Sequence, residues 1–428
     1  MQLNKTFLRA SWIGAVVIAL AIYPVIAWSA VPSASPDHIT LTWSGDPHTT
    51  QTITWRTDVA TNDGWVEFFE ASFNRPFDAL SRKAPATLLF FTTNSIDMNL
   101  HSAILSGLKP GTSYIYRVGD GKSWSERYSF RTEPTKPLPF KILVFGDSQS
   151  TVTPNLGYGV WRKTLVAAYG ENPDAAFFVN VGDLVDVGQD YAHWEQWFEA
   201  ADGIISSLNA MPVIGNHETY SPSGKFSMPL YFTSQFNLPQ NGPERLRGQV
   251  YSFDYGNAHI VVLDSQAGEE GRFVPGMLEE QVQWLDEDLR STSKRWKLVF
   301  FHRPPFSNRP GGDNANIRNA LTPILDKHHV DFVFNGHDHG YARTYPLFND
   351  NRVEDSDRGT VYVTVGRSGT KTYSGLISRS TDALFHDTRE ETNYVVIEVS
   401  SETLTLKAYS LSGALIDSYA AKKFTSIN

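Results

Sequence analysis

The sequence contains no cysteine among its 428 residues. Disulfide bonds, thiolate metal ligands and cysteine nucleophiles are therefore excluded together. The sequence also lacks an excess of positive charge, because its formal net charge is −9. An acidic chain has no general attraction for polyanions, so we expect no nucleic acid partner, and any affinity for phosphate must be created locally.

The length and composition favour a globular protein with more than one domain. A chain of 428 residues exceeds what one hydrophobic core usually organises. The apolar share of 41% and the charged share of 19% are ordinary for globular proteins. The sequence therefore predicts two folded domains.

The first thirty residues predict an export signal. Lys5 and Arg9 precede an apolar run over residues 12–28, and small residues follow at its end. We expect cleavage near Ala30. The alternative is an uncleaved N-terminal anchor, and only in that case do we expect the protein to be associated with a membrane. Without cysteine, and with Asn4 the single glycosylation acceptor, the chain resembles a bacterial periplasmic, secreted or cell-surface protein.

Residues 36–135 predict a domain made of β-strands. Short alternating segments are separated by turn residues, and they cover 39–43, 52–55, 65–69, 103–105, 114–118 and 128–131. The stretch 108–118, which contains Tyr114 and Tyr116, resembles the corner of fibronectin type III domains, in which a tyrosine hydroxyl bonds to nearby backbone. No catalytic side chains gather in this domain, so we expect a packing or positioning module.

A proline-rich linker, residues 136–139, separates this domain from a second domain over residues 140–425. Apolar segments there alternate with helical patterns such as 278–289, which is typical of buried sheets covered by helices. The strands that we expect cover 141–145, 176–181, 212–214, 260–263, 297–301, 331–334 and 361–365, followed by a hairpin over 394–399 and 404–409. The second domain is therefore predicted to be α/β.

Five of these strands end in a polar cluster that contains a possible metal ligand. The clusters are Gly146-Asp147, Gly182-Asp183, Gly215-Asn216-His217-Glu218, His302-Arg303 and Gly336-His337-Asp338-His339. Taken singly, such pairs are more typical of turns and caps. Ligand sites of open α/β sheets lie outside the carboxyl ends of strands, so we expect the five clusters to converge there.

In this order the clusters resemble the calcineurin-like metallophosphoesterase superfamily, whose pattern is Asp, Gly-Asp, Gly-Asn-His-Asp/Glu, His and Gly-His-x-His. The preceding sandwich and Tyr341-Ala342-Arg343 are similar to its purple acid phosphatase-like subgroup. The resemblance spans residues 36–423. It implies a fibronectin type III-like sandwich followed by an α/β metallophosphoesterase domain, built as a four-layer α-β-β-α sandwich, and the hydrolysis of phosphate esters.

The resemblance also implies a centre of two metal ions, with Asp183 bridging them. The other implied ligands are Asp147 and His339 at the first site and Asn216, His302 and His337 at the second. Oxygen and nitrogen ligands suit Fe, Mn or Zn, as divalent or mixed-valence ions. A hydroxide bridging the ions would attack phosphorus. His217 would either bind the phosphoryl group or protonate the leaving oxygen. Asn216 would also bind the phosphoryl group, and Glu218 would orient these residues through its carboxylate.

One ligand of the first site departs from the family pattern. Purple enzymes carry a tyrosine three residues after the bridging aspartate, and Asp186 stands there. Other members carry a histidine two residues after the first aspartate, and Gln149 stands there. Asp186 could supply a carboxylate instead, Gln149 could supply an amide oxygen, or the site could be open to solvent. Among these replacements for the missing ligand we rank Asp186 first, although a structural role as a helix-capping or loop aspartate is about equally expected. Tyr191 lies nearby in the sequence, and we expect it to be a packing residue.

Two arginines could bind phosphate with their planar guanidinium groups, Arg303 and Arg343, although such arginines also commonly pair with carboxylates. We favour Arg343 as the phosphate ligand. The leading function is the hydrolysis of phosphate monoesters outside the cytoplasm. The alternatives are a phosphodiesterase or nucleotidase of the same superfamily, and a non-catalytic surface-binding protein whose metal site has decayed.

Overall fold

The computed structural model describes residues 31–71, 81–151, 157–312, 314–354 and 359–423. The predicted export signal, residues 1–30, lies outside these described residues. Within them, every helix is too short or too polar to cross a membrane.

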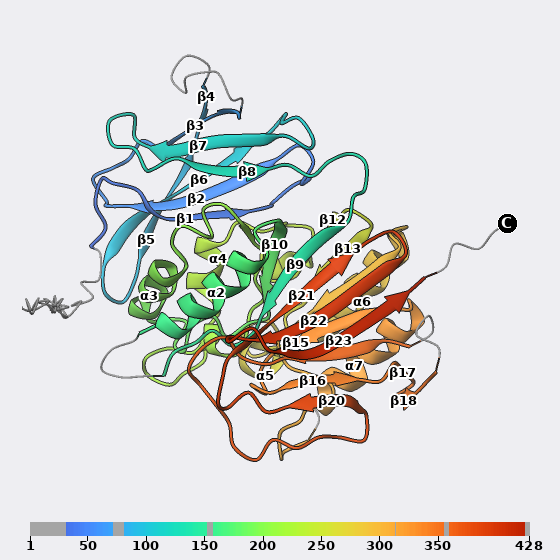
Figure 1. Ribbon diagram of the computed structural model, residues 1–428. Coiled ribbons are helices and arrows are strands. Elements are labelled where there is room, and N and C mark those ends of the chain that lie inside the picture. The colour runs from blue at the N-terminus through green and yellow to red at the C-terminus, as the bar shows by residue number, and fades with distance from the viewer. Residues whose placement is uncertain (1–30, 72–80, 152–156, 313, 355–358, 424–428) are drawn as a thin grey trace, which may run out of the picture.

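The N-terminal domain is a β-sandwich of two antiparallel four-stranded sheets, drawn in blue and cyan in Figure 1. In spatial order, one sheet holds β1 (Asp37–Thr42), β2 (Gln51–Thr57), β6 (Asp97–Leu105) and β5 (Thr87–Thr92), and the other holds β4 (Arg82–Pro85), β3 (Trp65–Glu70), β7 (Ser113–Gly119) and β8 (Tyr128–Arg131). Their inward side chains, among them Ile53, Trp55 and Tyr116, form one apolar core. The sandwich predicted from the strand spacing is confirmed.

The sandwich contains two strands, β4 and β5, that the sequence pattern did not predict. The alternation of polar and apolar residues did not reveal β5, because its consecutive Leu88, Leu89 and Phe90 lie on an exposed edge strand. The tyrosine corner is present as predicted: the backbone N–H of Lys109 donates to the Tyr114 hydroxyl at 2.9 Å. This bond fixes the turn that precedes β7.

The second domain contains a six-stranded and a seven-stranded mixed sheet. The first holds, in spatial order, β11 (Asn209–Ala210), β10 (Ala175–Asn180), β9 (Phe140–Phe145), β21 (Asn393–Val399), β22 (Thr403–Ser410) and β23 (Leu415–Lys422). The second holds β12 (Tyr251–Tyr255), β13 (Ala258–Val262), β14 (Trp296–Phe300), β15 (Phe332–Asn335), β19 (Val361–Val365), β16 (Tyr341–Thr344) and β20 (Asp382–His386). A small ribbon pairs β17 (Leu347–Phe348) with β18 (Asn351–Arg352).

Helices cover the outer faces of the two sheets. They are α2 (Gly159–Glu171), α3 (Tyr191–Ala201), α4 (Leu230–Gln235), α5 (Ala267–Glu270), α6 (Met277–Ser291) and α7 (Ala315–Lys327), with short 3₁₀ turns at His217–Thr219 and Glu244–Leu246. Helices α2 and α3 lie on the opposite side of the domain from α6 and α7 (Figure 1). The predicted four-layer α-β-β-α fold is confirmed.

Helix α6 shows why its sequence forms a surface helix. Met277, Gln281, Leu285 and Leu289 recur at four-residue intervals, and all four are buried. Acidic residues in its first turn and a basic residue in its last turn complement the helix dipole. The helix predicted over 278–289 is therefore confirmed, with slightly wider bounds.

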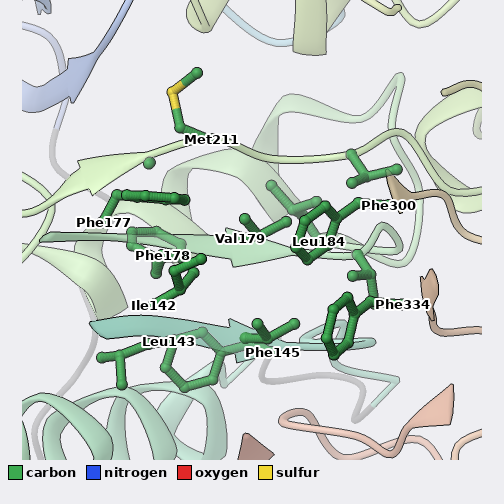
Figure 2. Packing of buried hydrophobic residues seen from close by; sticks show 14 of the residues in the cluster. Ile142, Leu143, Phe145, Phe177, Phe178, Val179, Leu184, Met211, Phe300 and Phe334 are labelled. Carbon is green, nitrogen blue, oxygen red and sulfur yellow. The ribbon is translucent and has the colours of Figure 1, made fainter. Parts of the chain in front are cut away.

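The core lies between the two sheets. Phe145 and Phe178 from the six-stranded sheet and Phe300 and Phe334 from the seven-stranded sheet belong to the same buried cluster (Figure 2). The strands that carry them are almost wholly apolar because they are covered on both faces. Burial of aromatic rings on both sides therefore holds the two sheets together face to face.

One predicted strand is displaced. The strand expected over 212–214 lies instead at β11, Asn209–Ala210. Residues 211–213 continue alongside β10 through the backbone bonds from Met211 to Phe178 and from Val213 to Asn180. These two bonds lie on either side of Pro212, which an edge strand tolerates, so the chain stays beside β10 beyond the end of β11.

Buried polar contacts join the two domains. Arg56 of β2 is fully buried and forms ion pairs with Asp37 at 2.6 Å and with Glu195 of α3 at 3.2 Å. The Tyr116 hydroxyl donates to the Ser206 carbonyl at 2.7 Å. These contacts support the predicted role of the first domain as a packing module.

The stability of the fold should depend on pH through His259, which lies outside the polar clusters at the strand ends. His259 of β13 contacts Asp254 at 2.7 Å through Nδ1 and Asp288 at 2.8 Å through Nε2. Burial lowers its pKa, but both carboxylates raise it, and the balance raises the pKa of His259 to about 9. The folded pKa exceeds the unfolded value, so the stabilisation is complete below pH ~6.5 and is lost as the pH rises through about 9.

We expect His259→Gln to destabilise the fold at pH 6 by at most about 3 kcal/mol, and by much less at pH 10. Thermal unfolding of both proteins at the two pH values measures this difference. His386→Gln is the matched control, because His386 is exposed on the edge strand β20. An equal loss of stability at both pH values would exclude a contribution from the charge of His259.

Candidate metal centre

The polar clusters that end five strands converge as predicted. Strands β9 and β10 are parallel neighbours in one sheet, and β14 and β15 are parallel neighbours in the other. Their carboxyl ends therefore lie at one edge of the paired sheets. The buried side chains gathered there are Asp147, Asp183, Asn216, His302, His337 and His339.

Four of these residues have a backbone conformation that L-amino acids rarely adopt. Among the described residues, Asp147, Asp183, His337 and His339 have φ values of 50°, 54°, 70° and 60°. A left-handed conformation costs about 1–3 kcal/mol at a non-glycine residue. These four make up half of the eight described non-glycine residues with a positive φ, and strained residues of this kind are typical of functional sites.

Glycines allow the loops to approach one another closely. A Cβ atom on Gly215 would lie 2.2 Å from the Asp183 carboxylate, and one on Gly182 would lie 2.7 Å from the His302 ring. Gly182 also has a φ of +95°, which favours glycine. Gly182 and Gly215 therefore each make room for a ligand from another loop.

The first group of ligand atoms comes from Asp147, Asp183 and His339. His339 Nε2 lies 3.0 Å from Asp147 Oδ1 and has no hydrogen-bond partner, although it is buried. Its Nδ1 contacts the carbonyl of Lys371 at 2.8 Å, so Nδ1 carries the proton and Nε2 keeps its lone pair. A buried imidazole nitrogen without a donor is suited to a metal ion.

The second group comes from Asp183, His302 and His337, and it shares Asp183 with the first. His302 Nδ1 donates to the Val181 carbonyl at 2.9 Å, which directs Nε2 toward Asp183 Oδ2 at 3.2 Å. His337 Nδ1 lies 3.0 Å from the Asn216 amide oxygen and 3.3 Å from His302 Nε2. Four ligand atoms therefore face one point.

Burial and neighbouring charges shift the pKa values of Asp183, His302 and His337 in this second group. Burial would raise the pKa of Asp183, but His302 and His217 hold it well below its usual value. Burial would lower the pKa of His302, but Asp183 raises it to about 9. Burial and the neighbouring His302 hold the pKa of His337 well below its usual value. Metal binding at His302 therefore releases a proton.

Glu218 supports the bridging position from behind. Its carboxylate accepts the backbone N–H groups of Asp183 at 2.9 Å and Leu184 at 2.8 Å, and that of Gly215 at 2.7 Å. It thereby ties the loop after β10 to the loop that carries Asn216. The orienting role predicted for Glu218 fits these contacts, because such supports hold ligands in a fixed geometry.

The residues fit two metal ions. In each group, the ligand atoms lie within 4.8 Å of one another, and Asp183 belongs to both groups. Carboxylate, amide and imidazole ligands without thiolates suit Fe, Mn or Zn. A carboxylate shared by two adjacent sites is the arrangement that a bridged pair of ions requires.

Two family models match the chain: the purple acid phosphatase N-terminal domain over residues 36–132 and the calcineurin-like phosphoesterase domain over residues 140–341. The chain belongs to the purple acid phosphatase-like metallophosphoesterases. The predicted resemblance is confirmed, and the chain is a metal-dependent phosphoric ester hydrolase of this family. The alternative of a non-catalytic binding protein is therefore set aside.

Several proteins illustrate this relationship. Acid phosphatase type 7 of Homo sapiens is 26% identical over 370 residues, which cover 79% of this chain and 79% of that protein. Purple acid phosphatase 21 of Arabidopsis thaliana is 26% identical over 346 residues, which cover 79% of this chain and 73% of that protein. The structure of a purple acid phosphatase from yellow lupin seeds matches with a TM-score of 0.77 at 20% identity, covering 92% of this chain and 75% of that one, and shows the shared fold.

The side chain that replaces the tyrosine of the purple acid phosphatases contacts His217. Asp186 Oδ1 lies 3.3 Å from His217 Nδ1 and 3.5 Å from Lys371 Nζ, and Asp186 is outside both groups of ligand atoms. Gln149 is buried, and its amide is satisfied when the oxygen faces Lys371 at 3.2 Å and the nitrogen donates to the Asp183 carbonyl at 3.1 Å. The ligand role of Asp186 stays a prediction.

Arg343 does not join this metallophosphoesterase centre. Its guanidinium group binds the Asp417 carboxylate through Nε at 2.6 Å and Nη2 at 3.1 Å, and it stacks over Tyr419. This pair links β16 to β23 and leaves the fork of Arg343 engaged. The structure therefore assigns Arg343 a structural ion pair, which corrects the preference for Arg343 over Arg303 as a phosphate ligand.

Other cations lie at the centre instead. Arg303 Nη1 and Arg309 Nη1 lie 3.0 and 2.8 Å from His337 Nε2, and Lys371 Nζ lies 2.6 Å from His217 Nε2. The sequence analysis did not single out Arg309 or Lys371. A signal existed for Lys371, because it follows the predicted strand 361–365 through a Gly-Arg-Ser-Gly-Thr loop, like the other strand-end clusters.

Proposed function

We propose that this metallophosphoesterase hydrolyses phosphate monoesters. The observation that carries the proposal is a dense group of cations, Arg303, Arg309 and Lys371, around two overlapping groups of ligand atoms. The chain as a whole is acidic, with a net charge of −9, so this cationic rim is local. A terminal phosphate carries up to two negative charges and matches it better than a diester, which carries one.

The residues of the site would have two roles, to bind the metal ions and to bind the phosphoryl group. When bound, two ions supply an acidified water as the nucleophile and neutralise charge on the phosphoryl oxygens. Asp147 and His339 would hold one ion; Asn216, His302 and His337 would hold the other; and Asp183 would belong to both. The guanidinium groups of Arg303 and Arg309 lie beside His337, where they would donate hydrogen bonds to phosphoryl oxygens.

The arginines are fixed by their surroundings. Arg303 Nη2 binds the Glu269 carboxylate at 2.5 Å, and Arg303 Nε donates to Gln266 at 3.2 Å. The buried Asp338 carboxylate accepts the Asn308 N–H at 2.6 Å, which holds the loop next to Arg309. Groups held in place before the substrate arrives need little reorganisation during the reaction.

A phosphodiesterase or nucleotidase is the second candidate. A cavity of about 1050 Å³ adjoins Arg303, and its lining includes Glu269 and Asn314. This volume would accommodate the second substituent of a diester or a nucleoside, which is the observation in favour of this alternative.

The test is hydrolysis of p-nitrophenyl phosphate beside bis(p-nitrophenyl) phosphate by protein of residues 31–428, loaded separately with Mn²⁺, Zn²⁺ or Fe²⁺. We expect turnover that a chelator abolishes and that added metal restores, with kcat/KM for the monoester at least about tenfold higher. A faster diester reaction would favour the alternative. No turnover with any metal would contradict both.

We further propose that the enzyme acts outside the cytoplasm, in the periplasm, at the cell surface or in the medium. The support is the basic and then apolar pattern of residues 1–30. In a bacterial host that exports the full-length chain, intact mass distinguishes a mature protein that begins near Val31 from an uncleaved anchor.

A further inference from the structure

Lys371 lies on a tightly packed loop at the metal centre. Its backbone carbonyl accepts the Nδ1 proton of His339 at 2.8 Å. Two residues earlier, Gly369 packs so closely that a Cβ atom there would lie 2.2 Å from the Gln149 carbonyl. The main chain of Lys371 is thus fixed against both the first ligand loop and His339. Its side chain therefore has a defined starting point beside the centre.

The ammonium group of Lys371 contacts three side chains, and the contacts with His217 and Gln149 are its hydrogen bonds. Nζ lies 2.6 Å from His217 Nε2, 3.5 Å from Asp186 Oδ1 and 3.2 Å from the Gln149 amide oxygen when that oxygen faces it. Asp186 belongs to neither of the two groups of ligand atoms. The side chain of Lys371 is 19% exposed, so the cation remains accessible to a substrate.

The hydrogen bonds of His217 determine which group can donate to a substrate. His217 Nδ1 lies 2.5 Å from the backbone carbonyl of Asp186, an acceptor only, so Nδ1 carries the proton. His217 Nε2 then keeps its lone pair and accepts from Lys371. The ammonium group of Lys371 has three N–H donors and uses two of them in hydrogen bonds to His217 and Gln149, so its third donor is available to a substrate. His217 Nε2 lies 3.9 Å from Asp183 Oδ2, which places this donor beside the metal centre.

We propose that Lys371 is a further catalytic residue, which donates a hydrogen bond to the leaving oxygen of the phosphate ester, and that His217 positions it. The proposal rests on the proposed phosphomonoesterase function. The oxygen of water forms a bond to phosphorus, and the bond to the leaving oxygen breaks with its electron pair on that oxygen. A proton from the attacking water ends on the leaving oxygen through solvent, so Lys371 keeps its charge.

A fixed ammonium group next to this oxygen stabilises the negative charge that develops there. Such a donor, acting where water is largely excluded, contributes about 10²-fold or more to the rate. The contribution depends on the leaving group, because a poor leaving group such as an alkoxide carries more charge in the transition state than a nitrophenolate does. Removal of the Lys371 side chain should therefore lower kcat for alkyl phosphates more than kcat for nitrophenyl phosphate.

The experiment compares Lys371→Met with the wild type on a series of phosphate monoesters, from p-nitrophenyl phosphate to phenyl phosphate and an alkyl phosphate. We expect a loss of about 10²-fold or more in kcat for the alkyl ester and less than tenfold for the nitrophenyl ester. Metal content, measured by mass spectrometry, should stay at the wild-type level. Lys371→Arg should restore part of the alkyl phosphatase activity, because it retains a cationic donor. Lys163→Met is the matched control, since Lys163 is exposed on α2.

The other outcomes overturn the proposal. An equal loss for all esters would show that Lys371 supports the fold or the binding of phosphate rather than the leaving group. Loss of metal from Lys371→Met would assign the residue to the metal centre. A wild-type enzyme without monoesterase activity would contradict the proposed function itself, and the experiment separates that failure from a failure of Lys371.

Discussion

Asp183→Asn is expected to lower kcat/KM for a phosphate monoester by about 10³-fold or more. Asp183 belongs to both groups of ligand atoms, and its carboxylate also accepts the His217 N–H at 2.9 Å. The substitution removes a negative charge that both sites share, and metal ions contribute several kcal/mol to the stabilisation of phosphoryl transfer. Kinetics of protein loaded with metal, beside its metal content, measure the effect.

The matched control is Asp174→Asn, because Asp174 is an exposed carboxylate that pairs with Lys141 at the surface. The control should keep full activity and metal content. The retained fold of Asp183→Asn would be checked by circular dichroism and thermal unfolding. Activity within tenfold of the wild type would contradict the assignment of Asp183 to the bridging position.

Asp417→Asn is expected to lower the free energy of unfolding by about 3 kcal/mol. Asp417 neutralises Arg343, which is 8% exposed, and accepts the Tyr341 hydroxyl at 2.7 Å. Removing one partner of a buried ion pair leaves the other charge without compensation, which costs about 3–5 kcal/mol. Urea or thermal unfolding of the two proteins measures the loss.

A double variant separates the loss of the pair from the penalty of an orphaned charge. Arg343→Met combined with Asp417→Leu should recover much of the stability, because well-packed apolar residues can replace a buried ion pair. The kcat and KM of the double variant should stay near the wild-type values. A raised KM at unchanged stability would instead return Arg343 to the substrate site.

Local sequence pattern predicted the two domains and most of their strands, and the family resemblance implied how the layers of the second domain stack. Alternating residues marked most strands of the sandwich, and continuous apolar residues marked the central strands of the second domain. Strand β5 was missed because its consecutive apolar residues lie on an exposed edge. The strand predicted over 212–214 was displaced because the regular pairing with β10 covers only Asn209 and Ala210 of the edge strand β11. Strand β23, whose burial is irregular, also escaped prediction. Such elements are decided by their neighbours rather than by their own residues.

The ligand set was predicted from the family resemblance, whose ordered motif places these residue types at the ends of strands. Asp147, Asp183 and Asn216 each follow a glycine, and the structure brings them together with His302, His337 and His339. The surrounding cations were not predictable in the same way. An arginine looks alike in sequence whether it faces Asp417 or His337, and only the packing of distant segments separates the two cases.

The sequence by itself predicted the fold class and the family, because periodicity and ordered motifs are properties of the chain, and the resemblance implied six metal ligands whose side chains the structure brings together. The tertiary structure alone decided that Arg343 binds Asp417, that Arg303 and Arg309 border His337, and that Lys371 meets His217, Gln149 and Asp186. The physical reason is that a charged side chain takes its role from the groups within a few ångströms, and these come from segments far apart in the chain.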